Sequence, residues 1–162
     1  MLRITHILLI CLSAAFGCKA QKWNLSSTAV EVGDVFISQN GPFFGLGKWN
    51  LVSESIPFLD SLERFLQNNP TVSIEISHHC DSRASNSYSL DLTQLKANTI
   101  VDSLIARGVA AERLKAKGCG ESQPIIPDAE ISILKTEQER ENAYAVNRRT
   151  ESKIIAIDFQ EK

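Results

Sequence analysis

Hydrophobic and polar residues follow two periods along this chain from residue 30 onward. Apolar residues at every second position are typical of strands with one buried face, whereas a spacing of three or four is typical of helices that pack on a core. Strands are predicted at residues 30–38, 71–77, 113–117 and 151–159. Helices are predicted from Ser53 or Ser55 to Asn68, from Ser89 or Leu90 to Arg107, and at residues 137–149.

The alternation of strands and helices predicts the fold class. Helices between strands favour crossover connections, so we expect an α/β (α+β) two-layer sandwich. It should contain a mixed sheet of about four strands with the helices packed on one face. Gly108 is expected to end the second helix in the left-handed conformation, and residues 123–136 are expected to be irregular. The predicted buried stripe of the second helix consists of Leu92, Leu95, Ile100, Leu104 and Ile105.

The N-terminus has the pattern of a secretory signal peptide. Residues 7–16 form an apolar run that is too short to cross the ~30 Å hydrocarbon core of a bilayer as a helix. Two cleavage sites are compatible with the sequence. Cleavage before Cys18 would leave a lipid anchor on that cysteine, and cleavage after Ala20 would leave none.

Composition and charge are those of an ordinary globular domain. Of the 162 residues, 43% are hydrophobic, and the formal net charge of −2 comes without a basic stripe, which argues against a nucleic-acid partner. No segment after the N-terminus is apolar enough to cross a membrane. We expect a signal peptide at residues 1–20, a polar tether at 21–29 and one globular domain at 30–159.

Two cysteines lie in the predicted domain, Cys80 and Cys119, each near the end of a predicted strand. In an oxidising compartment they could form a disulfide, provided that their Cα atoms lie within ~7 Å of each other. The alternative is two small buried thiols. The sequence leaves both alternatives open.

Charged residues at the ends of predicted strands form the best candidate site. Asp81 follows the second strand, and Lys96 lies one position beside the apolar stripe of the second helix. Asn147, Arg148 and Arg149 precede the last strand. One carboxylate facing several cations suits a zwitterionic ligand, because Asp81 could bind an ammonium and the cations could bind carboxylates. The same residues could instead form a turn cap and surface ion pairs.

The residues before Asp81 could also indicate a zinc site or a catalytic Cys-His dyad. His78 and Cys80 would point to one side of an extended segment, but two ligands do not make a zinc site. Cys80 and His79 would point to opposite sides, which argues against a catalytic dyad. We therefore expect no metal, no cofactor and no enzymatic activity.

The ordered set of motifs resembles the OmpA-like peptidoglycan-binding domain. The motifs are Asn69-Pro70, His79-Cys80-Asp81, Gly118-Cys119-Gly120-Glu121 with Pro124, and Asn147-Arg148-Arg149 with Glu151. The resemblance covers roughly residues 30–159. It implies that Asp81 contacts the ammonium of diaminopimelate and that Lys96, in the place of an arginine, contacts its carboxylate. It also implies that Asn147 and Arg148 border the same pocket.

Several positions differ from the family pattern. Cys80, Ala84 and Ser89 replace a threonine, a glycine and an asparagine, and Lys96 keeps the charge of an arginine but not its planar bidentate geometry. Residues 124–147 also form a longer segment than is common.

The resemblance implies a non-catalytic protein of the cell envelope, at the outer membrane facing the periplasm or in the periplasm. Its partner would be peptidoglycan, so that it would anchor the outer membrane to the cell wall. The alternative is a fold that has lost this ligand and serves as an interaction module for other envelope proteins.

Overall fold

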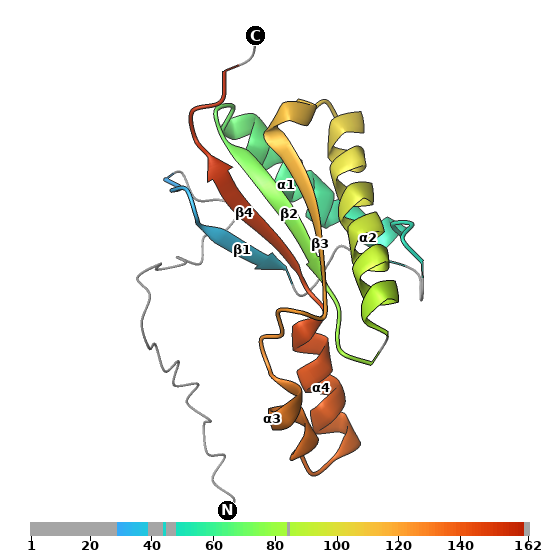
Figure 1. Cartoon of the computed structure of the whole chain (residues 1–162). Coiled ribbons are helices and arrows are strands. Elements are labelled where there is room, and N and C mark those ends of the chain that lie inside the picture. The colour runs from blue at the N-terminus through green and yellow to red at the C-terminus, as the bar shows by residue number, and fades with distance from the viewer. Residues whose placement is uncertain (1–28, 39–43, 45–47, 84, 161–162) are drawn as a thin grey trace, which may run out of the picture.

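Four strands form one mixed sheet in the order β1-β4-β2-β3 (Figure 1). The computed structural model describes residues 29–38, 44, 48–83 and 85–160. Strand β2 runs parallel to β3, and β4 is antiparallel to both β1 and β2. The strands are β1 (Val35–Ser38), β2 (Ser73–His79), β3 (Leu114–Gly120) and β4 (Thr150–Ala156). The predicted four-stranded mixed sheet is therefore confirmed.

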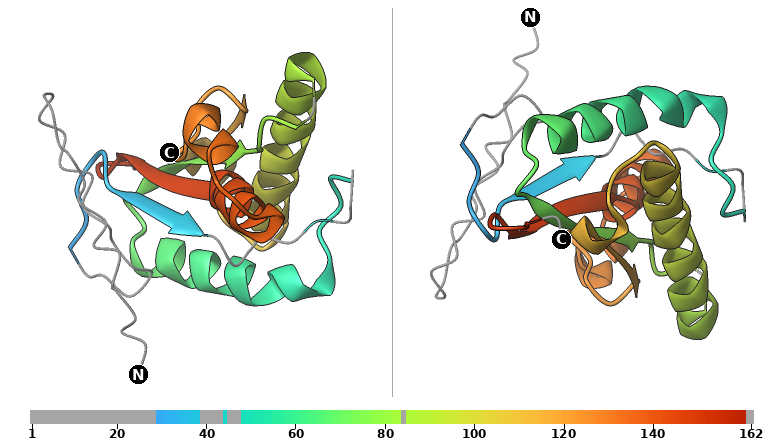
Figure 2. Two further views of the ribbon diagram at one scale, coloured as in Figure 1. Left: turned by 90° about the horizontal axis from the view of Figure 1, so that it is seen from below. Right: turned by 90° about the horizontal axis from the view of Figure 1, so that it is seen from above.

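Two long helices cover one face of this sheet, and two shorter helices form a lobe at its end (Figures 1 and 2). The long helices are α1 (Ile56–Asn68) and α2 (Asn86–Ala106). The lobe contains α3 (Asp128–Ser132) and α4 (Glu137–Asn147), and we call residues 121–149 the α3–α4 lobe. Single 3₁₀ turns occupy Ser53–Ser55 and Ala111–Arg113.

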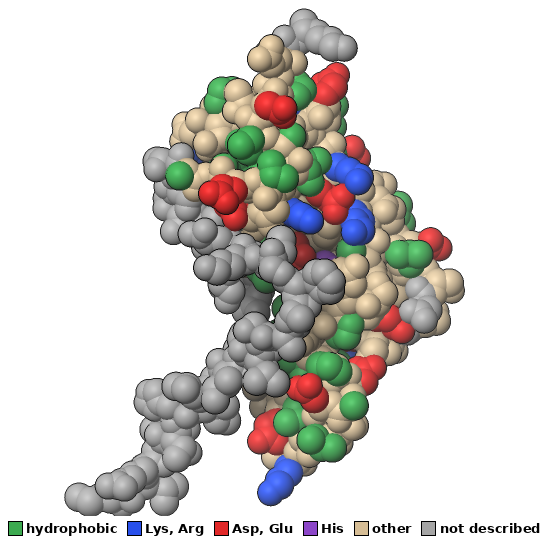
Figure 3. Space-filling model, turned by 60° about the vertical axis from the view of Figure 1, so that its left-hand side comes forward, with side chains coloured by type: hydrophobic (Ala, Val, Ile, Leu, Met, Phe, Trp, Pro, Cys, Tyr) green, Lys and Arg blue, Asp and Glu red, His purple; other side chains and the backbone are tan. Residues whose placement is uncertain are grey.

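The hydrophobic core lies between the long helices and the sheet. Ile74, Ile76 and Ile154 of the sheet are fully buried against apolar residues of α1 and α2, such as Leu62 and Leu104. On the other face of β2, Glu75 pairs with Lys115 at 3.0 Å and with Lys117 at 3.7 Å. The surface in Figure 3 shows basic and acidic side chains intermixed, without a continuous basic patch on that face.

Helix α2 differs from its predicted buried stripe. Leu95 and Ile105 are 42% and 38% exposed, whereas Thr93 and Ala97 are buried. The reason is close packing on β3: Thr93 Oγ1 accepts a hydrogen bond from the Gly120 amide at 2.9 Å. Small residues fit where a helix approaches glycine backbone. Ile100 and Leu104 of the predicted stripe are fully buried, so the prediction was wrong only for Leu95 and Ile105.

The remaining elements follow the prediction with shifted ends. The first strand is shorter than predicted, because a turn at Gly33 (φ 101°) precedes it and it begins at Val35. Gly108 ends α2 with φ 92°, as predicted. The segment 123–136 is not wholly irregular, since α3 begins after Pro127, which fits a helix N-terminus.

None of the helices in the described part of the chain has the length and apolarity needed to cross a membrane. The predicted signal peptide, the lipid attachment at Cys18 and nearly all of the tether lie outside the described residues.

Candidate functional site

Asp81 lies just beyond the end of β2, where backbone hydrogen bonds fix the chain between β3 and β4. The amide of His79 donates to the Arg149 carbonyl at 2.9 Å, and the amide of Cys80 donates to the Gly120 carbonyl at 3.0 Å. The Asp81 side chain is 10% exposed. The carboxylate is therefore held at the end of the sheet where β2 stops, beside the α3–α4 lobe.

Two arginines bind this carboxylate. Arg83 donates from Nε to Oδ1 at 3.2 Å and from Nη2 to Oδ2 at 2.8 Å. Arg148 donates from Nη1 to Oδ2 at 2.6 Å. Burial opposes ionisation of Asp81, but the hydrogen bonds from Arg83 and Arg148 outweigh it and lower the pKa of the carboxyl to about 2. Asp81 is therefore fully ionised at neutral pH.

Glu141 of α4 binds the same two arginines from the other side. Arg83 Nη1 donates to Glu141 Oε2 at 2.8 Å, and Arg148 Nη2 donates to Oε1 at 2.6 Å. The Arg83 guanidinium also lies over the Tyr144 ring, 4.6 Å from its centroid. The four residues Asp81, Arg83, Glu141 and Arg148 thus form a closed set of alternating charges, which we call the charge ring.

Lys96 of α2 lies close enough to Arg148 of this ring for their charges to interact. Its amine lies 5.0 Å from the centroid of the Phe44 ring, which in turn contacts the ring of His78 edge-on at 5.3 Å. Burial, together with the charge of Arg148, lowers the pKa of the Lys96 amine below its ordinary value. Among the described residues no carboxylate pairs with this amine. Lys96 is therefore a partly desolvated cation without an anionic partner in the described chain.

Asn147 has a different set of contacts from the other predicted site residues. Its Oδ1 accepts hydrogen bonds from the amides of Ile125 at 2.8 Å and Ile126 at 2.9 Å, and its Nδ2 donates to the Ile126 carbonyl at 2.8 Å. The side chain is 1% exposed. In the structure, Asn147 fixes the start of the α3–α4 lobe.

Arg149 also points away from the charge ring. It donates from Nε to Glu151 at 2.7 Å and from Nη2 to the Gln123 carbonyl at 3.0 Å. Of the three consecutive residues Asn147, Arg148 and Arg149, the structure brings only Arg148 into contact with Asp81. The neighbours Asn147 and Arg149 hold the backbone on either side.

Replacing Asn147 by alanine is expected to lower the free energy of unfolding by about 2 kcal/mol, because three backbone groups lose their partner. Chemical denaturation measures this change. The matched control is Asn142→Ala, which removes an exposed amide from the same helix. Equal losses in the two variants would contradict the role of Asn147 in fixing the lobe.

His78 and the two cysteines near the ends of β2 and β3 are neutral at pH 7. Burial, and then the charge of Lys96, lowers the pKa of His78 to about 3, and its Nδ1 lies 2.9 Å from Thr150 Oγ1. Burial raises the pKa of the thiols of Cys80 and Cys119, and both are free cysteines in the structure. Their thiols have different neighbours, Ser89 for Cys80 and Ser77 for Cys119. The disulfide stays a prediction of the sequence.

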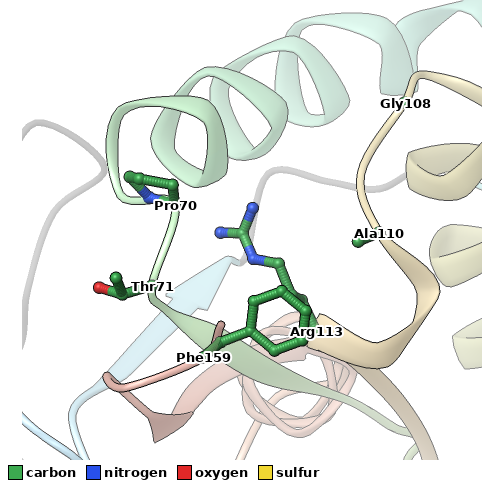
Figure 4. Close-up of a pocket in the computed structure, with 6 residues that line it drawn as sticks. All are labelled: Pro70, Thr71, Gly108, Ala110, Arg113 and Phe159. Carbon is green, nitrogen blue, oxygen red and sulfur yellow. The ribbon is translucent and has the colours of Figure 1, made fainter. Parts of the chain in front are cut away.

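A separate pocket of about 210 Å³ lies at the opposite end of β2 from Asp81 (Figure 4). Arg113 forms part of its wall, but its guanidinium donates to the carbonyls of Leu66, Asn69 and Val72 at 2.7–2.8 Å. These bonds join the end of α1 to the start of β2. The described residues contain no group of three or more His, Cys, Asp or Glu side chains placed to hold a metal ion.

Sequence reasoning missed Arg83 and Glu141 as members of the site. Arg83 follows Asp81 by only two residues. A turn at Asp81 could therefore have been expected to bring the arginine back onto the carboxylate. Glu141 precedes Arg148 by seven residues, which places both on one face of the predicted helix 137–149; in the structure Arg148 is the residue that directly follows α4. The contact between α4 and the end of β2 could not be read from either segment alone.

Comparison with known proteins identifies the family: residues 43–140 match the OmpA family, and the chain belongs to it. The chain is 27% identical over 155 residues to the peptidoglycan-associated lipoprotein of Pasteurella multocida (strain Pm70). That alignment covers 92% of this chain and 97% of the relative. The family consists of non-catalytic domains, which agrees with the prediction that the protein is not an enzyme.

Solved structures show the same fold. The peptidoglycan-associated lipoprotein from Burkholderia pseudomallei matches with a TM-score of 0.56 and 21% identity, over 69% of this chain and 86% of that one. The cell wall anchor of the T6SS from Pseudomonas aeruginosa matches with a TM-score of 0.59 and 23% identity, over 75% and 80%. Several relatives are named as cell-envelope proteins, among them outer membrane porin F of Pseudomonas aeruginosa and the periplasmic domain of Helicobacter pylori MotB.

Proposed function

We propose that the protein binds peptidoglycan without a covalent bond, through the diaminopimelate of its stem peptides, and so anchors the outer membrane to the cell wall. The observation that carries this proposal is the amine of Lys96, which is partly desolvated and has no carboxylate partner in the described chain. A buried cation without an anion favours binding of a negatively charged group. Family membership and the names of the relatives support peptidoglycan as the source of that group.

The charges of the site match the end of diaminopimelate that carries both an ammonium and a carboxylate. Lys96, Arg83 and Arg148 contribute three positive charges, and Asp81 and Glu141 contribute two negative charges, so the site offers a carboxylate to the ligand ammonium and an excess of cations to the ligand carboxylate. Asp81 would accept a hydrogen bond from the ligand ammonium. Lys96 and Arg148 would donate to the carboxylate, in charge-assisted hydrogen bonds that are stronger than neutral ones.

The domain division and the anchor belong to the same proposal. A signal peptide at residues 1–20 would export the chain, the tether at 21–29 would separate the domain from the membrane, and residues 30–159 would bind the wall. A lipid on Cys18 would hold the chain in the outer membrane, as the lipoprotein relatives suggest. Intact-mass measurement of the membrane-extracted protein distinguishes a lipidated Cys18 from a chain that begins at Gln21.

Replacing Lys96 by methionine is expected to weaken binding to purified diaminopimelate-type sacculi about tenfold, since one charge-assisted hydrogen bond is lost. Co-sedimentation with the sacculi over a range of concentrations measures the affinity. Lys135→Met is the matched control, because it removes an exposed lysine from the α3–α4 lobe. Equal binding by the two variants would contradict the proposed role of Lys96.

One observation favours the alternative of an envelope interaction module without this ligand. Asp81 is already neutralised by two arginines, so a ligand ammonium has to compete with them for the carboxylate. If the wild-type protein does not pellet with sacculi, this alternative replaces the anchor, and capture experiments with envelope proteins follow.

A further inference from the structure

Glu141 holds the two arginines of the charge ring in the same way that a ligand carboxylate would. Its two oxygens accept one hydrogen bond each, from Arg83 at 2.8 Å and from Arg148 at 2.6 Å. Hydrogen bonds from a guanidinium to a carboxylate are stronger than those between neutral groups. The carboxylate that occupies them here comes from α4 of the protein itself.

The hydrogen bonds of the arginines show which carboxylate an incoming ligand would have to replace. Arg83 uses Nε and Nη2 for Asp81 and Nη1 for Glu141, and Arg148 uses Nη1 for Asp81 and Nη2 for Glu141. A ligand carboxylate that takes the place of Glu141 therefore gains one N–H from Nη1 of Arg83 and one from Nη2 of Arg148, the two groups that point at Glu141.

Exposure and bonding identify Glu141 as the weaker competitor. The Glu141 side chain is 44% exposed, whereas that of Asp81 is 10% exposed. Asp81 also accepts a hydrogen bond from the backbone amide of Arg83 at 3.1 Å. The hydrogen bonds of Glu141 come from the two arginine side chains. Exposed ion pairs contribute little to stability and exchange readily with other partners. The arginines themselves are 49% and 39% exposed, so a ligand can reach them.

We propose that Glu141 is an internal competitor that occupies Arg83 and Arg148 in the free protein and is displaced by the ligand's carboxylate. This inference rests on the proposed function of the site. It makes Glu141 a specificity-determining residue: a ligand with a free carboxylate can replace it, whereas a ligand amidated at that carbon is neutral there and cannot. The long α3–α4 lobe, which carries Glu141, thereby takes part in ligand selection.

The competition predicts that removing the charge of Glu141 strengthens binding. Glu141→Gln is expected to bind a soluble stem peptide that ends in diaminopimelate about 3- to 10-fold more tightly than the wild type, because the ligand no longer has to displace a carboxylate. Isothermal titration calorimetry measures the affinity. Glu137→Gln removes the same charge from an exposed position on the same helix and is expected to leave the affinity unchanged.

The outcomes separate this inference from the proposed function. If the wild type binds and Glu141→Gln binds equally or more weakly, Glu141 supports the arginines rather than competing with the ligand, and the inference is overturned. If Glu137→Gln strengthens binding equally, the effect comes from net charge, which also overturns it. If neither the wild type nor Glu141→Gln binds the peptide, the proposed function fails, and the inference fails with it. Thermal unfolding of each variant confirms that the measured proteins are folded.

Discussion

Replacement of Asp81 by alanine is expected to lower the affinity for diaminopimelate-type sacculi by roughly 30- to 100-fold. A hydrogen bond between charged groups contributes about 2–3 kcal/mol, and every 1.4 kcal/mol corresponds to a factor of ten. Asp81 is the least exposed carboxylate of the charge ring, and its pKa of about 2 keeps it ionised throughout the range in which binding is measured. Without it, a ligand ammonium would face Arg83 and Arg148, which repel it.

Co-sedimentation compares this variant with Asp102→Ala, which removes an exposed aspartate from the far half of α2. The control is expected to bind as the wild type does. Because loss of Asp81 leaves two arginines with one carboxylate fewer, the thermal unfolding temperature of the variant is measured in parallel. If the Asp81→Ala protein is folded and pellets as strongly as the control, binding to the wall does not depend on Asp81.

Gly118→Ala is expected to destabilise the fold by about 3 kcal/mol, the largest effect on stability that we predict. A Cβ atom at Gly118 would overlap the backbone nitrogen of Gln94 and would lie 2.7 Å from its Cα atom. The Gly118 amide also donates to Gln94 Oε1 at 2.8 Å. Relief of the overlap requires α2 to move away from β3, which would displace Lys96 as well.

Gly108→Ala is the comparison that distinguishes a steric overlap at Gly118 from backbone strain. Gly108 has a φ of 92°, and a Cβ atom there would meet no atom within 4 Å. We expect that variant to lose about 1 kcal/mol from strain alone. Chemical denaturation measures both variants, and a Gly118→Ala protein that is no less stable than Gly108→Ala would contradict the close packing of α2 on β3.

The fold could be predicted because its signals are local. Alternation in the segment that contains Ile74 and Ile76 placed β2, and Gly108 ended α2 where expected. The prediction was wrong where long-range packing decides the outcome. Leu95 is exposed and Thr93 is buried because the glycines of β3 lie against α2. The sequence of α2 alone does not show which strand it packs on.

The site could be predicted only in part for the same reason. Asp81, Lys96 and Arg148 were identified from motif positions, and the structure brings Asp81 and Arg148 into contact. The partners that modify their charge, Arg83 and Glu141, became visible once α4 was placed beside the end of β2. Asn147 belongs to the same motif as Arg148, yet its amide is engaged by backbone groups of the lobe.

The central claim is that Asp81, Lys96 and Arg148 together bind one end of diaminopimelate, and an NMR titration tests it most directly. Free diaminopimelate is added to isotopically labelled protein while the side-chain signals of these residues are followed. The account predicts saturable shifts of the Asp81 carboxylate carbon and of the Lys96 amine with a single affinity. Signals that stay unchanged at saturating ligand, or shifts confined to the pocket around Arg113, would contradict it.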